Sequence, residues 1–151
     1  MFQLIQIMYV RIHSHKWSSS AYYLFRAKNY PPVDRYEPNN SIATASSISH
    51  NTTITDANIH TSSDIDYYKF ITSKESVTTI NLYFIPSACD YDLHLLSSTG
   101  IVLAISNKMS NAPEIITVWL EPGTYYIKVY SHIGASSSNY RLDLSVGDIY
   151  V

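Results

Sequence analysis

The chain has 151 residues, of which 46% are hydrophobic and 15% charged, and its formal net charge is -2. This length accommodates one domain of ordinary size with a substantial core, and it excludes two. A near-neutral chain without a basic stripe lacks the electrostatic footprint of a nucleic-acid-binding protein. The 14 tyrosines, with frequent threonine, favour β-strands over helices.

The first thirty residues differ in pattern from the rest of the chain. Residues 1–10 are apolar, but ten residues are too few to span a bilayer. The basic residues Arg11 and Lys16 follow this run, whereas a signal peptide carries its positive charges first. A degenerate export signal, the remnant of a longer upstream protein and an unnatural start of the reading frame all fit the pattern. Pro31-Pro32 marks a boundary, so we expect an irregular leader (1–33) followed by one domain (34–151).

From residue 51 onward the sequence consists of short alternating runs separated by turn-forming residues. Alternation of period two places one face of a strand in the core and the other in water. The pattern predicts eight strands: Thr53–His60, Asp66–Thr72, Val77–Phe84, Tyr91–Leu96, Ile101–Asn107, Glu114–Leu120, Thr124–Ser131 and Asn139–Val146.

Only the segment Ser41–Ser46 has a helical character, and the side chains of Asn39 and Asn40 precede it as potential caps. Many short strands with almost no helix predict a sandwich or barrel. We therefore expect an all-β fold, an antiparallel jelly-roll-like β-sandwich of about eight strands.

Two acidic clusters carry side chains with hard oxygen donors. The first includes Glu37, Asn39 and Asn40, and the second includes Asp66, with Asp64 nearby. Ca²⁺ takes six to eight oxygen ligands, and a backbone carbonyl near Tyr67 and water would complete such a shell. The alternative is that the asparagines cap a turn while the aspartates are solvated at the start of a strand.

Five motifs occur in order along the chain: EPNNSIATA (37–45), DIDYYKF (64–70), DYDLHLL (90–96), LEPGTYYIKVY (120–130) and NYRLDL (139–144). Over 34–146 this series resembles the bacterial pre-peptidase C-terminal domain. It is also similar to the collagen-binding domains of clostridial collagenases. The resemblance implies a secreted, non-catalytic β-sandwich attached to a parent peptidase.

The resemblance also implies a calcium site. It assigns the metal to a set of five residues: Glu37, Asn39, Asn40, Asp66 and the carbonyl of Tyr67. Two departures reduce the negative charge of this set. Arg35 stands where two-calcium members carry an acidic residue, and Asn40 stands where aspartate is common. We therefore expect at most one weak calcium site.

The ligand surface implied by the resemblance lies on the strand that contains GTYY. Tyr130 and His132 fall at positions where the collagen-binding relatives carry exposed aromatic side chains, and Tyr126 shares the outward face by the period-two rule. The expected partner is an extracellular polymer or protein, collagen among them. A stand-alone carbohydrate- or matrix-binding sandwich and a purely fold-assisting domain are the alternatives.

No motif in the chain predicts catalysis. His-Glu-x-x-His and Gly-x-Ser-x-Gly are both absent, and the six histidines are scattered. His94 is expected to point into solvent, and Asp90 and Asp92 to share the surface face of one strand. Cys89, the only cysteine, cannot form an internal disulfide and lacks a basic sequence neighbour to activate its thiol. We therefore predict no catalytic residues.

Overall fold

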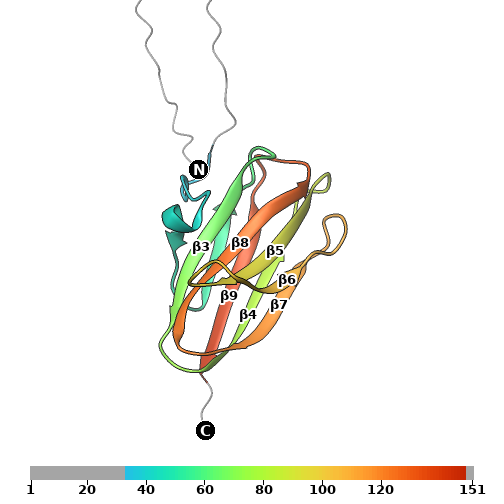
Figure 1. The fold of residues 1–151 in the computed structure, drawn as a ribbon. Coiled ribbons are helices and arrows are strands. Elements are labelled where there is room, and N and C mark those ends of the chain that lie inside the picture. The colour runs from blue at the N-terminus through green and yellow to red at the C-terminus, as the bar shows by residue number, and fades with distance from the viewer. Residues whose placement is uncertain (1–32, 149–151) are drawn as a thin grey trace, which may run out of the picture.

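The structure, a computed structural model, describes residues 33–148, so the predicted leader lies almost wholly outside the described residues (Figure 1). This part of the chain contains one short 3-10 helix and nine strands. They are η1 (Ile42–Thr44), β1 (Ser46–Ser47), β2 (Thr52–Ala57), β3 (Ile65–Thr72), β4 (Ser76–Tyr83), β5 (Asp90–Ser97), β6 (Val102–Ser106), β7 (Glu114–Leu120), β8 (Gly123–Ile133) and β9 (Tyr140–Asp148).

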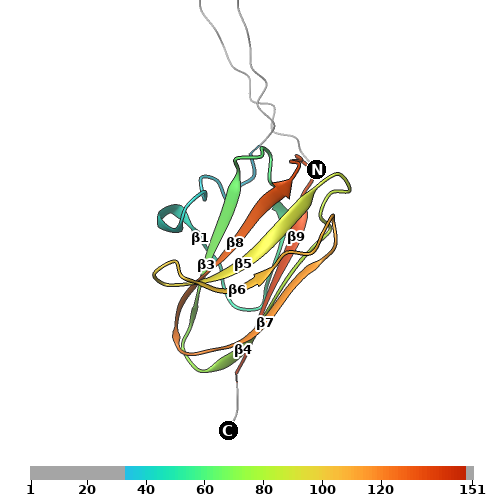
Figure 2. The ribbon, with the colours of Figure 1, turned by 45° about the vertical axis from the view of Figure 1, so that its right-hand side comes forward.

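The strands form two packed sheets with the orders β1-β3-β8-β5-β6 and β2-β9-β4-β7 (Figures 1 and 2). From β2 onward the chain crosses repeatedly between the sheets, and the eight strands take the order of a jelly roll. The predicted β-sandwich is therefore confirmed. The two-residue strand β1 was not predicted, and it pairs with β3 in parallel, whereas all other strand pairs in the described part are antiparallel.

The core lies between the sheets and is built by the predicted alternation. On β8 the side chains of Ile127 and Val129 are fully buried, while their neighbours on the strand are half-buried on the outer face. On β9 the residues Tyr140, Leu142 and Leu144 alternate inward in the same way. Burying one such aliphatic side chain stabilises the fold by about 1.5–3 kcal/mol. The alternating pattern is thus the main source of stability.

Two tyrosine hydroxyl groups in the core are paired across the two sheets. The Tyr68 hydroxyl on β3 lies 2.7 Å from that of Tyr140 on β9, and both side chains are buried. The Tyr140 ring also packs edge-to-face on Tyr91 of β5, with centroids 6.3 Å apart. These contacts fix the spacing of the sheets near the end where β3 begins.

Three predicted strands end earlier than the pattern indicated, and the one expected to reach Asn107 stops at Ser106. The strand expected to reach His60 stops at Ala57, because the Asn58 and His60 N–H groups donate to the carboxylates of Asp34 and Asp64 rather than to a neighbouring strand. Phe84 was expected to face the core beside Leu82. Its φ of 56° turns the chain out of β4, and 71% of the residue is exposed.

The cap of the short helix also differs from the expectation. Ser41, not an asparagine, occupies the N-cap of η1, and its N–H donates to Thr44 Oγ1 (3.2 Å). Asn40 instead accepts a hydrogen bond from the Ile65 N–H through Oδ1 (2.9 Å). This bond attaches the segment before η1 to the start of β3.

Candidate functional site

Three segments of the chain meet where β3 begins: the segment before η1, the loop after β2 and the first residues of β3. The first segment is held to β3 by a hydrogen bond from the Tyr67 N–H to the Asn39 carbonyl oxygen (2.9 Å). It is held to the loop by Asp34 Oδ2, which accepts from the Asn58 N–H (2.7 Å). The side chains gathered here form what we call the acidic cluster: Asp34, Glu37, Asn39, Asn58, His60, Asp64 and Asp66.

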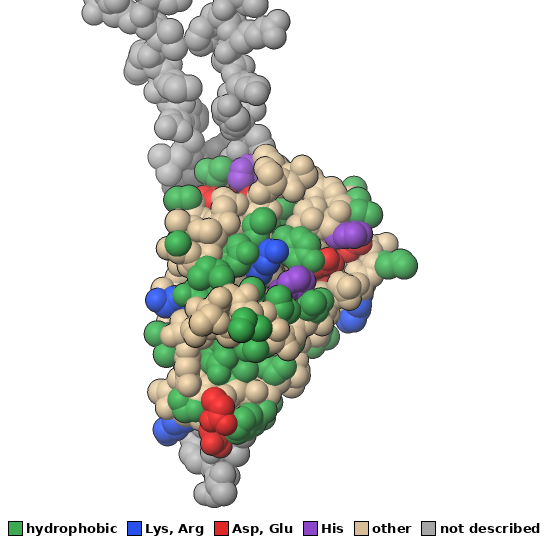
Figure 3. Space-filling view, viewed as in Figure 1, with side chains coloured by type: hydrophobic (Ala, Val, Ile, Leu, Met, Phe, Trp, Pro, Cys, Tyr) green, Lys and Arg blue, Asp and Glu red, His purple; other side chains and the backbone are tan. Residues whose placement is uncertain are grey.

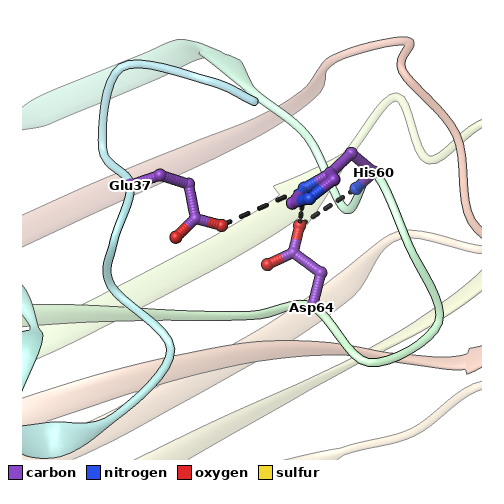
Figure 4. Close-up of side chains that lie close together, drawn as sticks. All are labelled: Glu37, His60 and Asp64. Carbon is purple, nitrogen blue, oxygen red and sulfur yellow. Dashed lines mark hydrogen bonds and ion pairs between the residues drawn. The ribbon is translucent and has the colours of Figure 1, made fainter. Parts of the chain in front are cut away.

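Two carboxylates of the cluster face one imidazole (Figure 4). Asp64 Oδ2 accepts from the His60 backbone N–H (3.0 Å) and lies 2.6 Å from His60 Nδ1. Glu37 Oε1 lies 4.0 Å from the same nitrogen. One ligand atom from each residue lies within 4.8 Å of the other two, so a single ion could contact all three.

Five buried oxygen atoms of the cluster have no hydrogen-bond partner in the described part of the chain. They are Glu37 Oε1, Asn39 Oδ1, Asn58 Oδ1, Asp64 Oδ1 and Asp66 Oδ1. An unpaired buried polar group costs about 1–3 kcal/mol, and more when it is charged, so native structures pair nearly all of them. Carboxylate and amide oxygens are the donors that Ca²⁺ prefers, and Glu37 and Asp64 converge on one point. The residues present therefore fit a calcium ion.

Asp66 lies fully buried between the two sheets. Its Oδ2 accepts a hydrogen bond from the Tyr140 hydroxyl (2.5 Å). Burial raises the pKa of Asp66 to about 8, the nearby carboxyls of Asp34 and Asp64 add to the increase, and the Tyr140 hydrogen bond opposes it. The Asn39 amide beside Asp66 also favours the charged form, although its Nδ2 makes no hydrogen bond of ordinary geometry. The carboxyl alone is thus largely protonated at neutral pH, and a cation beside it would favour the charged form.

Two more carboxyls of the cluster are shifted in the same direction. Burial, and then the neighbouring Asp64, raises the pKa of Glu37. Burial also raises the pKa of Asp34, although two backbone N–H groups donate to its carboxylate and oppose the shift. Burial thus makes the charged form of several neighbouring carboxyls unfavourable. A cation bound among them would lower the free energy of the charged form.

The predicted metal ligands occupy different positions relative to this cluster. Glu37, Asn39 and Asp66 each contribute an unpaired oxygen atom. Asn40 uses both ends of its amide, because Nδ2 donates to Glu37 Oε2 (2.9 Å) while Oδ1 accepts from the Ile65 N–H. Tyr67 contacts the segment through its N–H, and the ligand role of its carbonyl stays a prediction.

Sequence reasoning missed His60 and Asn58, which belong to the cluster. They were missed because the alternating pattern predicted that the strand extends to residue 60, which placed both residues inside it. The spacing His60-x-x-x-Asp64 was the available signal, since both side chains can meet when the chain between them turns.

The outer face of the five-stranded sheet carries the predicted ligand-binding residues. Tyr126 and Tyr130 lie on the outer face of β8 and are half-buried, and His132 is exposed near the end of that strand. The outward direction predicted for the tyrosines is thus confirmed, while their binding role stays a prediction. Figure 3 shows this face, where a histidine lies beside a basic side chain among neutral and hydrophobic groups.

Tyr130 is held in place by two neighbours on this face. Its hydroxyl is hydrogen-bonded to His94 Nε2 (3.1 Å), and the two rings meet edge-to-face with centroids 5.0 Å apart. Lys128 Nζ lies 4.3 Å from the Tyr130 ring centroid, which is a cation–π contact. His94 was expected to be solvated, but it is half-buried, and burial followed by Lys128 lowers its pKa. The result is an ordered aromatic platform with a neutral imidazole.

Comparison with solved structures finds this fold in the pre-peptidase C-terminal domain of a collagenase from Bacillus anthracis. The TM-score is 0.53 and the sequence identity 21%, and the match covers 68% of this chain and 93% of that chain. A periplasmic inhibitor of g-type lysozyme from Aeromonas hydrophila matches with a TM-score of 0.47 and 9% identity, over 68% of this chain and 96% of that one. No family model and no curated protein sequence matches the chain. The collagenase domain thus has the fold that the sequence motifs predicted.

Between residues 33 and 148 no helix is both long enough and apolar enough to cross a bilayer.

Proposed function

We propose that this chain carries a non-catalytic accessory domain of a secreted bacterial peptidase. In this proposal the acidic cluster binds one calcium ion, and the outer face of the five-stranded sheet binds an extracellular polymer such as collagen. The similarity in fold to a collagenase domain supports the accessory role. The observation that carries the calcium part is the set of five buried oxygen atoms without hydrogen-bond partners.

The ion would sit where Glu37 and Asp64 converge beside His60, and the side chains of Asn39 and Asp66 would turn towards it. These four ligands come from three separate segments of the chain. These residues supply three carboxylates and one amide, and backbone or water oxygens would complete the six to eight ligands that Ca²⁺ takes. In this proposal Asn40 orients a ligand, because its Nδ2 donates a hydrogen bond to Glu37 Oε2. A bound calcium would supply the positive charge that the buried carboxyls lack and would tie the segment before η1 to β3.

The polymer would lie across β8, where Tyr126 and Tyr130 offer rigid aromatic area at low entropic cost. Lys128 and His94 hold the Tyr130 ring in one orientation, so little side-chain freedom would be lost on binding. His132 extends this surface towards the end of the strand.

Calcium binding is tested by thermal melting in EGTA, in 10 mM CaCl2 and in 10 mM MgCl2. A ligand that binds only the folded state at a hundredfold excess over its Kd adds about 2.7 kcal/mol of stability. We expect a higher Tm in calcium than in magnesium, and no calcium shift in Glu37→Gln. Identical melting curves in all three solutions would refute the calcium site.

Polymer binding is tested by co-sedimentation with insoluble collagen and with insoluble polysaccharides. We expect retention on collagen that is lost in the double variant Tyr126→Ala/Tyr130→Ala. Trp119→Ala is the matched control, because Trp119 is a half-exposed aromatic residue on β7 of the other sheet. Retention on a polysaccharide alone would favour the carbohydrate-binding alternative, and retention on neither would refute the binding surface.

A further inference from the structure

A second group of acidic side chains lines a hollow where β5 begins and β8 ends. The hollow has a main lobe of about 360 Å³ and a smaller lobe of about 90 Å³, and the two share Asp90, Met109 and His132. Ala88 and Ile133 line the main lobe, and Asp92 lines the smaller one. The main lobe is at the lower end of the size range of small-molecule pockets.

Asp90 and Asp92 were expected to stabilise a turn or to lie at the surface, but each is only 6% exposed. Asp90 Oδ1 is buried without a hydrogen-bond partner, and neither carboxylate forms an ion pair with a described residue. Asp92 lies opposite Tyr130. Burial, then hydrogen bonding to Asp92 and then the charge of Asp92 raise the pKa of the Tyr130 hydroxyl to about 12. The pocket thus holds two buried carboxylates without a cation from the described chain.

The backbone around the pocket is fixed by a close approach. Gly134 follows β8 with a φ of 77°, and a Cβ atom at this position would lie 2.7 Å from the Ala88 carbonyl oxygen. Only glycine allows this contact, because other residues would have both the steric clash and an unfavourable backbone conformation. The segment before β5 and the end of β8 therefore form fixed walls.

We propose that this pocket binds the guanidinium or ammonium group of a basic side chain on a bound polypeptide. The two carboxylates offer acceptors for a charge-assisted hydrogen-bonding group, of which the arginine fork is the best match. Met109 and Ile133 are exposed at 80% and 58%, so they provide apolar rims for the methylene stem of such a side chain.

The geometry favours an organic cation over a metal ion. Within residues 33–148 the one set of three acidic or histidine ligands close enough to share an ion is Glu37, His60 and Asp64. Asp90, Asp92 and His132 do not converge in that way, although they line the same hollow. A wide pocket with two acceptors and apolar rims suits a long side chain that carries its charge at the tip.

The pocket is continuous with the proposed polymer surface, so this inference rests in part on the proposed function. Asp92 lies directly opposite Tyr130 in the β5–β8 pairing, and Asp90 lies opposite Ile133. Figure 3 shows a histidine beside acidic side chains on this face, towards its right-hand edge. At about 3.3 Å per residue, the pocket at His132 lies roughly 7 Å along β8 from Tyr130. A polypeptide that contacts Tyr130 would thus pass within side-chain reach of the pocket.

The test is a titration of the full chain with N-acetyl-arginine amide, followed by ¹H–¹⁵N NMR, with N-acetyl-citrulline amide as the neutral isostere. We expect shifts at Asp90, Met109 and His132 with the arginine probe, and at least tenfold weaker binding of citrulline. Asp90→Asn/Asp92→Asn should weaken arginine binding about tenfold or more, since a hydrogen bond between charged groups is worth more than a neutral one. Glu121→Gln, which removes an exposed carboxylate in the turn before β8, should leave it unchanged.

Each outcome separates this inference from the proposed function. The proposal that the pocket binds cations is overturned if the wild type binds the arginine and citrulline probes equally, or binds neither, even if collagen is retained. This comparison uses the wild type alone and so does not depend on the folding of the variants. Arginine binding without polymer retention supports the pocket and refutes the polymer surface. Polymer retention that falls in the double Asn variant, with an unchanged melting curve, supports both.

Discussion

The buried Asp66 carboxyl should make the calcium-free protein less stable as the pH rises, and bound calcium should reduce this pH dependence. Its pKa is about 8 in the folded protein, against an ordinary value of 3.8. Because the folded-state pKa is the higher one, this group contributes its full stability below about pH 4 and loses it as the pH rises through about 8. Asp34 and Glu37 are shifted in the same direction and steepen the loss.

The magnitude follows from the size of the shift. One pKa unit corresponds to about 1.4 kcal/mol, so a shift of about four units is worth on the order of 5 kcal/mol, most of which is already lost at pH 7. For a domain of this size, each kcal/mol moves Tm by roughly 3–6 °C. The calcium-free protein should therefore melt more than about 10 °C lower at pH 8 than at pH 4.5.

The assay is a set of melting curves between pH 4.5 and 8.5, in EGTA and in 10 mM calcium. Calcium should flatten the curve of Tm against pH above pH 6, because a bound cation favours the charged carboxyls. Asp66→Asn keeps an oxygen acceptor for the Tyr140 hydroxyl and removes the charge. It should weaken the pH dependence in EGTA and also lose the calcium effect.

Asp143→Asn serves as the matched control. Hydrogen bonds from Tyr83, Thr53 and Arg141 lower the pKa of Asp143, so its contribution to stability is lost only as the solution is acidified towards and below pH 4. In this variant Tm should differ from the wild-type value by a constant amount at every pH above 5, so the dependence of Tm on pH and on calcium should stay as in the wild type. A wild-type Tm in EGTA that is flat from pH 4.5 to 8.5 would refute the raised pKa, and an equal calcium shift in Asp66→Asn would refute its role as a ligand.

Three further variants test the packing and the outer face. Tyr140→Phe removes the hydroxyl that bonds both Asp66 and Tyr68, and urea unfolding should show a loss of about 1–3 kcal/mol; a loss below 0.5 kcal/mol would contradict the role of this network. Leu93→Ala empties a fully buried position of β5 and should cost about 2–5 kcal/mol by the same measurement, while a neutral result would contradict its place in the core. Tyr130→Ala should keep Tm within a few degrees of the wild-type value and weaken collagen binding at least fivefold in co-sedimentation. Unchanged binding would show that Tyr130 does not contribute to the binding surface.

The strand pattern was predictable because most strands have one buried and one outward face. Ile127 and Val129 alternate with polar or amphipathic neighbours, and such a period specifies both the strand and its direction. Phe84 continues the alternation of β4 in the sequence, but a positive φ turns the chain out of the strand at this residue. The backbone conformation of Phe84 depends on the loop that follows. The alternation of residues in β4 therefore does not predict it.

The candidate metal site was predictable only in part, for a related reason. Glu37, Asn39 and Asp66 lie in recognisable motifs, whereas His60 reaches the cluster because carboxylates from distant segments accept the N–H groups of its loop. Those hydrogen bonds join residues that are far apart in sequence and have no local signature. The same limit applies to Asp90, which looks like a surface residue until Gly134 brings the end of β8 against the segment before it.

The two groups of acidic side chains lie at the same end of the sandwich, because Ile65 at the start of β3 and Asp90 at the start of β5 pair with the last residues of β8. They differ in the side of the sheet they occupy: Asp66 points between the sheets, and Asp92 lies with Tyr130 near the outer face. Tyr91 lies between them with its ring buried. Burial raises the pKa of its hydroxyl, and Cys89 at the wall of the pocket and the charges of Asp64 and Asp66 in the acidic cluster add to the increase. Each group therefore places carboxyl groups in a low-dielectric environment, where an ionised carboxylate attracts a cation strongly. The packed ring of Tyr91 leaves the acidic cluster, where we propose that an ion binds, deep in the fold, while the second group lines a hollow that is open to a side chain from outside.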